Sequence, residues 1–205
     1  MSSSLIFIID TSTSIQPYLQ HYTSAINGVI ESQRTTNPRT LLSLITFNDE
    51  IKYLCLNKAI DTLPVSPVTE EAIKPNGLTA FHDNVCAILQ HVNSFFTNNH
   101  QCPPVVVILT DGDDTSSRLL SERHTMLQVA RCKARGWRFI YLGVTDQAIT
   151  IGRKIGFDVC ILYDSTEGSF TRIPDAVHHF ISNEQQEHVD VDIRELTESI
   201  AGVSL

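Results

Sequence analysis

The chain has 205 residues, of which 42% are hydrophobic and 19% are charged. This length is typical of one domain, and the composition excludes a disordered or collagen-like protein. The formal net charge of −8 argues against a protein that binds nucleic acid by neutralising phosphates. No apolar run exceeds five residues, and the N-terminal run has no basic flank and stops at Asp10, so we expect neither a membrane span nor a secretory signal, and we place the protein in the cytoplasm.

Short apolar runs alternate along the chain with segments of helical periodicity. The first run, Leu5–Ile9, is bounded by polar residues and is typical of a strand buried on both faces. The clearest helix is Ala80–Phe96, whose apolar residues recur at offsets that place them on one face. In chain order we expect strand Leu5–Ile9, a helix with Pro17 in its first turn that ends near Arg34, strands Leu41–Phe47 and Ile51–Leu56, helix Ala80–Phe96, strand Val105–Leu109, helix Leu119–Ala134, strand Arg138–Gly143, helix Gln147–Lys154, strand Asp158–Tyr163 and helix Pro174–Ile181.

This alternation predicts an α/β fold with a doubly wound, mostly parallel sheet that carries helices on both faces. The two strands joined by Asn48-Asp49-Glu50 form a hairpin, which gives the sheet one antiparallel edge strand. We expect the domain to cover residues 1–183 and an acidic tail to cover residues 184–205. The tail has six acidic residues and one arginine, and its apolar residues fit a packed or partner-bound segment as well as a mobile one.

Two acidic residues directly follow strands that we expect to be neighbours. Asp10 follows the first strand and Asp111 follows Leu109 and Thr110. In open α/β sheets a ligand binds beyond the carboxyl ends of the strands, near the point where the strand order reverses. Both carboxylates are therefore candidates for a binding site at that edge.

Hydroxyl groups accompany the two acids. Residues 10–14 read Asp-Thr-Ser-Thr-Ser, and in an extended loop Asp10, Ser12 and Ser14 point to the same side. Thr79, just before the clearest helix, supplies another hydroxyl. Oxygen ligands of this kind suit a hard cation such as Mg²⁺ or Mn²⁺. Two carboxylates only balance the charge of a divalent ion. If one or both bind through water, the ion keeps an attraction for an outside anion, such as the Asp or Glu carboxylate of a protein partner.

Three segments together resemble the metal-ion-dependent adhesion site (MIDAS) of von Willebrand factor A domains. They are DTSTS at 10–14, the threonine of NGLTAFHDNV at 76–85, and the aspartate of VVVILTDGDDTSS at 105–117. The similarity runs through most of residues 4–183. It implies a six-stranded doubly wound sheet with one antiparallel edge strand, and Mg²⁺ or Mn²⁺ at its top. The short chain is similar to stand-alone intracellular members of that family.

The resemblance also implies a role for each residue of the site. Ser12 and Ser14 would be direct ligands, Thr79 and Asp111 would bind directly or through water, and Asp10 would hold a water ligand and the loop. Thr13 stands where a glycine is common in the family, and Ile15 stands where a methionine is frequent. Neither change removes a ligand, but both bear on the shape of the loop.

Simpler interpretations of these residues remain open at this point. Asp10, Ser12 and Ser14 could cap the helix that follows them. Asp83 is expected to serve the first turn of its own helix, where negative charge is favourable. Asp113 and Asp114 are typical of a turn or a helix start. The five cysteines, an odd number without a Cys-x-x-Cys pair, are expected to be reduced thiols.

Two other functions compete with a metal-dependent interaction module. One is the same fold acting as a metal-independent scaffold. The other is a Mg²⁺-dependent phosphatase with Asp10 as nucleophile, but Ser12 stands where such enzymes need a second aspartate as general acid. We therefore expect no enzyme. We also expect Ser12→Ala or Thr79→Ala to weaken metal binding without unfolding the protein, because both residues are assigned to exposed loops.

Overall fold

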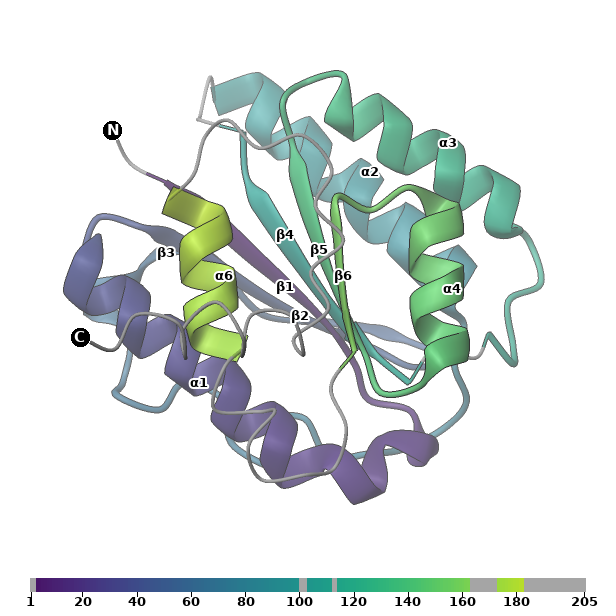
Figure 1. Ribbon diagram of the computed structural model, residues 1–205, viewed down its shortest axis with the longest axis horizontal. Coiled ribbons are helices and arrows are strands. Elements are labelled where there is room, and N and C mark those ends of the chain that lie inside the picture. The colour runs from purple at the N-terminus through teal and green to yellow at the C-terminus, as the bar shows by residue number, and fades with distance from the viewer. Residues whose placement is uncertain (1–2, 100–102, 112–113, 163–172, 183–205) are drawn as a thin grey trace, which may run out of the picture.

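The computed structural model describes residues 3–99, 103–111, 114–162 and 173–182. Its centre is a six-stranded sheet in the order β3-β2-β1-β4-β5-β6 (Figure 1). The strands are β1 (Ser4–Asp10), β2 (Leu41–Phe47), β3 (Ile51–Ala59), β4 (Val105–Thr110), β5 (Arg138–Gly143) and β6 (Val159–Leu162). The helices are α1 (Leu19–Thr36), α2 (Phe81–Asn99), α3 (Glu122–Lys133), α4 (Asp146–Ile155) and α6 (Ile173–Ser182).

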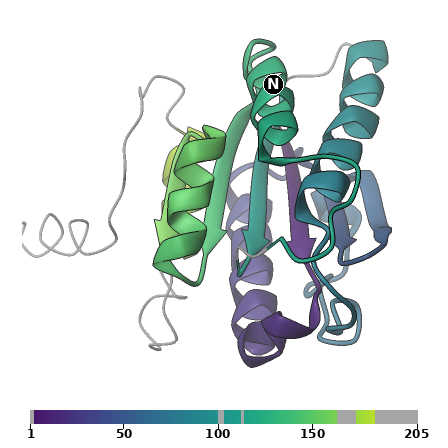
Figure 2. The same ribbon diagram turned by 90° about the vertical axis from the view of Figure 1, so that its right-hand side faces the viewer.

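The sheet has the predicted α/β topology. All neighbouring strands are parallel except β2 and β3, which form the antiparallel hairpin at one edge. The strand order reverses between β1 and β4, which pair directly, with Ile9 opposite Leu109. The arrowheads of these two strands point to the same end of the molecule in Figure 2. Asp10 and Asp111 therefore lie at the carboxyl ends of two adjacent parallel strands.

Helices cover both faces of the sheet because successive residues of its buried strands point to opposite sides. Leu5, Phe7 and Ile9 of β1 pack in the cluster that contains the apolar residues of α1 and α6. Ile6 and Ile8 pack in the cluster that contains those of α2, α3 and α4. Figure 1 shows these two groups of helices on either side of the sheet. Both central strands are fully buried, as their continuous apolar runs predicted.

The ends of β3 and α2 lie three residues later than predicted, and the starts of two helices are wrong as well. Thr13–Tyr18 form a 3-10 helix that contains Pro17, and the α-helix begins only at Leu19. Helix α3 begins at Glu122 instead of Leu119, because the backbone N–H groups of residues 118–120 are bound by a side chain of α2. Both helix starts lie at the edge of the sheet where the candidate site is found.

Some sequence predictions fall on residues outside the described ranges. The boundary between the domain and the acidic tail lies there, as does Asp113. Among the described residues, Cys55, Cys86, Cys132 and Cys160 are free thiols. No helix in the described ranges is long and apolar enough to cross a membrane.

Candidate metal centre

Three segments meet at the carboxyl ends of β1 and β4. The first is the loop that follows β1 and carries Asp10, Ser12 and Ser14. The second is the segment directly before α2, which contains Thr79, and the third begins with Asp111 after β4. The sequence predictions therefore fall on adjacent segments of one edge. The hydrogen bonds between these segments determine how closely the five side chains are held.

Asp10 is wholly buried at the end of β1. One carboxylate oxygen accepts the backbone N–H of Ser12 at 2.8 Å, and the other accepts the hydroxyl of Thr110 at 2.7 Å. Burial raises the pKa of Asp10 to about 6, although these hydrogen bonds lower it, and the nearby charge of Asp111 raises it further. The hydrogen bond from Ser12 to this carboxylate holds the start of the loop, and the charge of Asp111 acts on the same carboxylate.

The two serines of the loop lie side by side. Their Oγ atoms are 3.0 Å apart, with Ser12 buried and Ser14 exposed. Ser12 stands at the N-cap position of the 3-10 helix, but its side chain makes no capping hydrogen bond. The capping interpretation is therefore wrong for Ser12. Its hydroxyl and that of Ser14 form a pair of neutral oxygens that a cation could bind.

The segment before α2 is tied to this loop by its backbone. The N–H of Thr13 donates to the carbonyl of Gly77 at 3.0 Å, and the N–H of Asn76 donates to the carbonyl of Thr11 at 2.8 Å. Gly77 has a φ of +75°, and a Cβ there would lie 2.5 Å from a carboxylate oxygen of Asp49. Glycine is thus required at this position for both conformation and space.

Asp49, in the hairpin turn, links the second segment to the third. One of its oxygens accepts the N–H of Leu78 at 2.9 Å, and the other accepts the hydroxyl of Ser116 at 3.0 Å. Sequence analysis missed this residue, because nothing in a hairpin turn indicates that its carboxylate reaches residues 29 and 67 positions away. The geometry makes Asp49 a positioning residue for the site.

Thr79 is buried, and the third segment holds its backbone on both sides. Its N–H donates to the hydroxyl of Thr115 at 3.0 Å, and its carbonyl accepts the N–H groups of Thr115 and Ser116 at 2.9 and 3.0 Å. These contacts fix the Thr79 backbone without using its own hydroxyl. The side chain therefore keeps an oxygen that can serve as a ligand.

Asp111 carries the strongest sign that the site suits a cation. Its Oδ1 is buried and has no hydrogen-bond partner among the described residues. A buried polar atom without a partner costs free energy, and most such atoms in native proteins are bound to something. The other candidate ligands are hydroxyl and carboxylate oxygens, which are the hard ligands that Mg²⁺ and Mn²⁺ prefer. The residues therefore fit the implied metal.

Two other acidic residues near the site have structural partners. Asp114 accepts the N–H of Phe81 at 3.0 Å and so caps α2. Asp83 lies in the first turn of α2, as predicted, and accepts the N–H groups of Arg118, Leu119 and Leu120. Desolvation raises its pKa, but these three donors outweigh that effect and hold the pKa below its ordinary value. The described residues include no group of three or more His, Cys, Asp or Glu side chains placed to bind a metal.

One expectation about the site is corrected. We expected Ser12 and Thr79 on exposed loops, whereas only 1% of Ser12 and 3% of Thr79 is exposed. The loops fold back on one another through backbone hydrogen bonds, and this contact buries the side chains between them. Alanine variants at these positions must therefore be checked for stability as well as for metal binding.

Comparison with known proteins identifies relatives by sequence pattern and by fold. The von Willebrand factor type A domain matches residues 4–158. A search of curated proteins found none that matches this chain. Among solved structures, an aerotolerance-related membrane protein from Bacteroides fragilis superposes with a TM-score of 0.62 at 12% identity, covering 88% of this chain and 99% of that chain.

Two further structures have the same fold. The SpRpn10 VWA domain has a TM-score of 0.58 at 13% identity, covering 86% of this chain and 95% of that chain. The manganese-loaded TRAP protein of Plasmodium vivax has a TM-score of 0.56 at 19% identity, covering 74% of this chain and 63% of that chain. At these identities the likeness concerns the fold alone.

Proposed function

Because this chain belongs to the von Willebrand factor type A domain family, a family of protein-interaction modules, we propose that it binds a protein partner through a divalent cation. The cation is Mg²⁺ or Mn²⁺, and its site consists of Asp10, Ser12, Ser14, Thr79 and Asp111. The partner contributes an Asp or Glu carboxylate. The manganese in the related TRAP structure supports Mn²⁺ as the first ion to test.

The observation that carries this proposal is the buried Oδ1 of Asp111, which has no hydrogen-bond partner in the described part of the chain. A cation bound beside Asp111 would satisfy this atom. Asp111 follows the strand that pairs with β1, and its charge acts on the carboxylate of Asp10. A buried carboxylate beside a second, partly buried acid favours a cation that would offset both charges.

The chain's own residues divide the work between charge and positioning. Asp10 and Asp111 supply the negative charge, which is at most −2 in total. Neutral oxygens come from Ser12, Ser14 and Thr79. When bound, the ion supplies an electrophile with room for an oxygen of an outside carboxylate. Asp49 and the loop after β1 hold the backbone of Leu78 and Gly77, which leads into Thr79.

The experiment is a titration of the full chain with MnCl₂ and MgCl₂ by calorimetry, with thermal unfolding followed in parallel. We expect one cation per chain, and an unfolding temperature that rises with its concentration. Asp111→Ala should lose both effects. Capture of a partner from native lysate should then fail in EDTA and with Asp111→Ala. Capture that survives both, with unchanged affinity, would instead support the metal-independent scaffold.

A further inference from the structure

A polar pocket of about 260 Å³ lies between α2 and α3. No carboxylate lines it in the described part of the chain, although the whole chain has a net charge of −8. Its lining consists of two arginines, three amide side chains and one thiol, which are Arg131, Arg135, Gln90, Asn93, Gln128 and Cys132. The pocket therefore offers positive charge and amide hydrogen-bond donors to an occupant.

The two arginines of the pocket have no acidic partner. Both are exposed, and neither forms an ion pair with a described residue. Arg135 donates to the amide oxygen Oδ1 of Asn93 at 2.5 Å, a hydrogen bond that joins the end of α3 to α2. Lys133 differs from both arginines because it pairs with Asp158. The two guanidinium groups thus keep hydrogen-bond donors that suit a carboxylate from elsewhere.

The side-chain amide of Gln128 also lacks a strong partner. The side chain lines the pocket and is only 7% exposed. Its Nε2 donates to Sγ of Cys132 at 4.0 Å, and sulfur is a weak acceptor. Buried amides in native proteins usually have better partners than this. An occupant that brings a carboxylate into the pocket would accept a stronger hydrogen bond from Nε2.

The helix that precedes the acidic tail ends near this pocket. The guanidinium group of Arg138 donates to the carbonyls of Phe180 at 2.8 Å and Ile181 at 3.1 Å, and so holds the end of α6. Arg138 follows Arg135 by three residues, which span at most about 11 Å. Figure 1 shows α2, α3 and α6 ending at the same end of the sheet, where its parallel strands begin. The chain therefore leaves α6 at the end of the molecule that holds the two arginines.

Two acids of the tail are within reach of these arginines and match their spacing. Because α6 and α3 cover opposite faces of the sheet, two layers of about 10 Å each separate them. Asp190 follows Ser182 by eight residues, which extend up to about 26–29 Å. In an extended segment Asp190 and Asp192 point to the same side, about 7 Å apart. Arg131 and Arg135 line one pocket four residues apart, about one helical turn or roughly 6 Å.

We propose that the pocket between α2 and α3 binds the acidic tail of the same chain, with the carboxylates of Asp190 and Asp192 on the guanidinium groups of Arg131 and Arg135. Charge complementarity decides the occupant, because the tail has six acidic residues and one arginine. A tethered segment also binds at a high effective concentration. The inference does not depend on the proposed function, because the pocket and the candidate metal centre lie near opposite ends of the central strands.

The test measures binding of a synthetic peptide of residues 186–196 to the full chain by fluorescence anisotropy, in EDTA so that no cation competes for the acids. The unchanged chain should bind the peptide weakly, because its own tail occupies the pocket. Asp190→Asn with Asp192→Asn in the full chain frees the pocket, and the peptide affinity should rise about tenfold or more. Adding Arg131→Gln and Arg135→Gln to that variant should abolish the gain. The affinity should also fall as NaCl is raised, because salt screens exposed charges.

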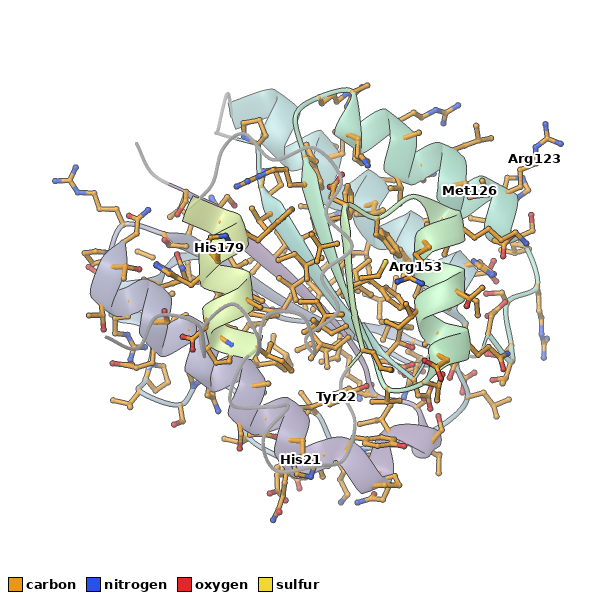
Figure 3. All side chains as sticks on the ribbon, viewed as in Figure 1. His21, Tyr22, Arg123, Met126, Arg153 and His179 are labelled. Atoms are coloured by element: carbon orange, nitrogen blue, oxygen red, sulfur yellow. The ribbon has the colours of Figure 1, made fainter. Side chains whose placement is uncertain are left out.

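The matched control is Arg118→Gln with Arg123→Gln, which removes the same charge near the opposite end of α3. Figure 3 shows Arg123 projecting outward from the N-terminal turn of that helix. Added to the tail variant, this pair should leave the peptide affinity unchanged. NMR gives a second measure, because the side-chain amide signal of Gln128 should shift when the two tail acids are replaced. Thermal unfolding checks that every variant remains folded.

Three results would overturn the inference. Equal peptide affinity in the unchanged chain and in the tail variant would mean that the tail does not occupy the pocket. An equal loss of affinity with the control pair would mean that net charge alone attracts the peptide. Light scattering that gives the mass of two chains for the unchanged protein, and of one chain for Arg131→Gln with Arg135→Gln, would assign the pocket to the tail of a second copy.

Discussion

Asp10 and Asp83 are both carboxylates that accept backbone N–H groups near the carboxyl ends of the central strands, but their surroundings differ. Asp83 lies at the surface and receives three N–H groups, which hold its pKa below the ordinary value even though desolvation raises it. Asp10 is wholly buried and receives one N–H and one hydroxyl, and its pKa is raised to about 6 by that burial.

This contrast separates an acid that the protein itself stabilises from one that a cation would stabilise. Asp83 has enough donors to be stable as an anion, so it can serve as a structural clamp for a loop. Asp10 is buried with fewer backbone donors, and Oδ1 of Asp111 has no hydrogen-bond partner among the described residues, so these two acids are the ones that a cation would stabilise. The number of hydrogen-bond donors and the depth of burial distinguish a candidate metal ligand from an acid that only holds a loop. Sequence position alone does not.

The largest effect is expected from Asp111→Asn. Mn²⁺ affinity should fall by roughly 100-fold or more, because even changes outside the immediate ligands commonly cost 10–100-fold. Stability in EDTA should stay the same or rise, because the variant removes the charge of a carboxylate whose Oδ1 has no hydrogen-bond partner among the described residues. Calorimetry and thermal unfolding measure both. Asp61→Asn, at an exposed acid of another segment, is the control. A variant that binds Mn²⁺ normally would remove Asp111 from the site.

A smaller loss is expected from Ser12→Ala. Mn²⁺ affinity should fall about tenfold, the lower end of the range for groups around a metal. The free energy of unfolding should change by less than about 1 kcal/mol, because Ser12 makes no capping hydrogen bond. Ser24→Ala removes an exposed hydroxyl of α1 and should not alter metal binding. Equal affinities of the two variants would argue against Ser12 as a ligand. Thr79→Ala should behave as Ser12→Ala does.

The clamp is tested by Asp83→Ala. Because three N–H groups lose their acceptor, we expect a loss of about 1–2 kcal/mol in the free energy of unfolding. Amide hydrogen exchange at residues 118–120 should become faster, whereas Mn²⁺ affinity should not change. Asp146→Ala removes an acid from the first turn of α4 and controls for the helix dipole. If Asp83→Ala lost Mn²⁺ binding, Asp83 would contribute to the metal site and would not have a purely structural role.

The smallest effect is expected from pH. Since folding lowers the pKa of Asp83 below its ordinary value of 3.8, the unfolded chain binds its proton first as the pH falls. The stabilisation is therefore complete at neutral pH and is lost as the pH falls through the folded pKa. Urea unfolding between pH 7 and pH 3 should show the unchanged chain approaching Asp83→Asn at the acidic end. A constant difference between the two would show that the charge of Asp83 does not matter.

Much of the site could be predicted because its residues stand in local patterns. Asp10, Ser12 and Ser14 occupy one short motif directly after a buried strand, and Asp111 follows a second such strand. The roles of Asp49 and Asp83 could not be predicted, because their partners are 29 to 67 residues away. The predicted start of a helix at Leu119 is wrong for the same reason, because the N–H groups of residues 118–120 bind the distant Asp83. A helical pattern cannot indicate that a distant carboxylate will take the N–H groups of that turn.

The amino-acid sequence by itself determined the α/β alternation, the reversal of strand order between β1 and β4, and the kinds of oxygen that meet there. These features depend on the spacing of apolar residues and on the motif of each loop. Only the tertiary structure decided that Ser12 and Thr79 are buried, that Oδ1 of Asp111 is left without a hydrogen bond in the described part of the chain, and that Leu119 is held out to solvent. Burial and hydrogen bonds between distant segments arise when loops pack on one another, and that packing cannot be read from any one segment alone.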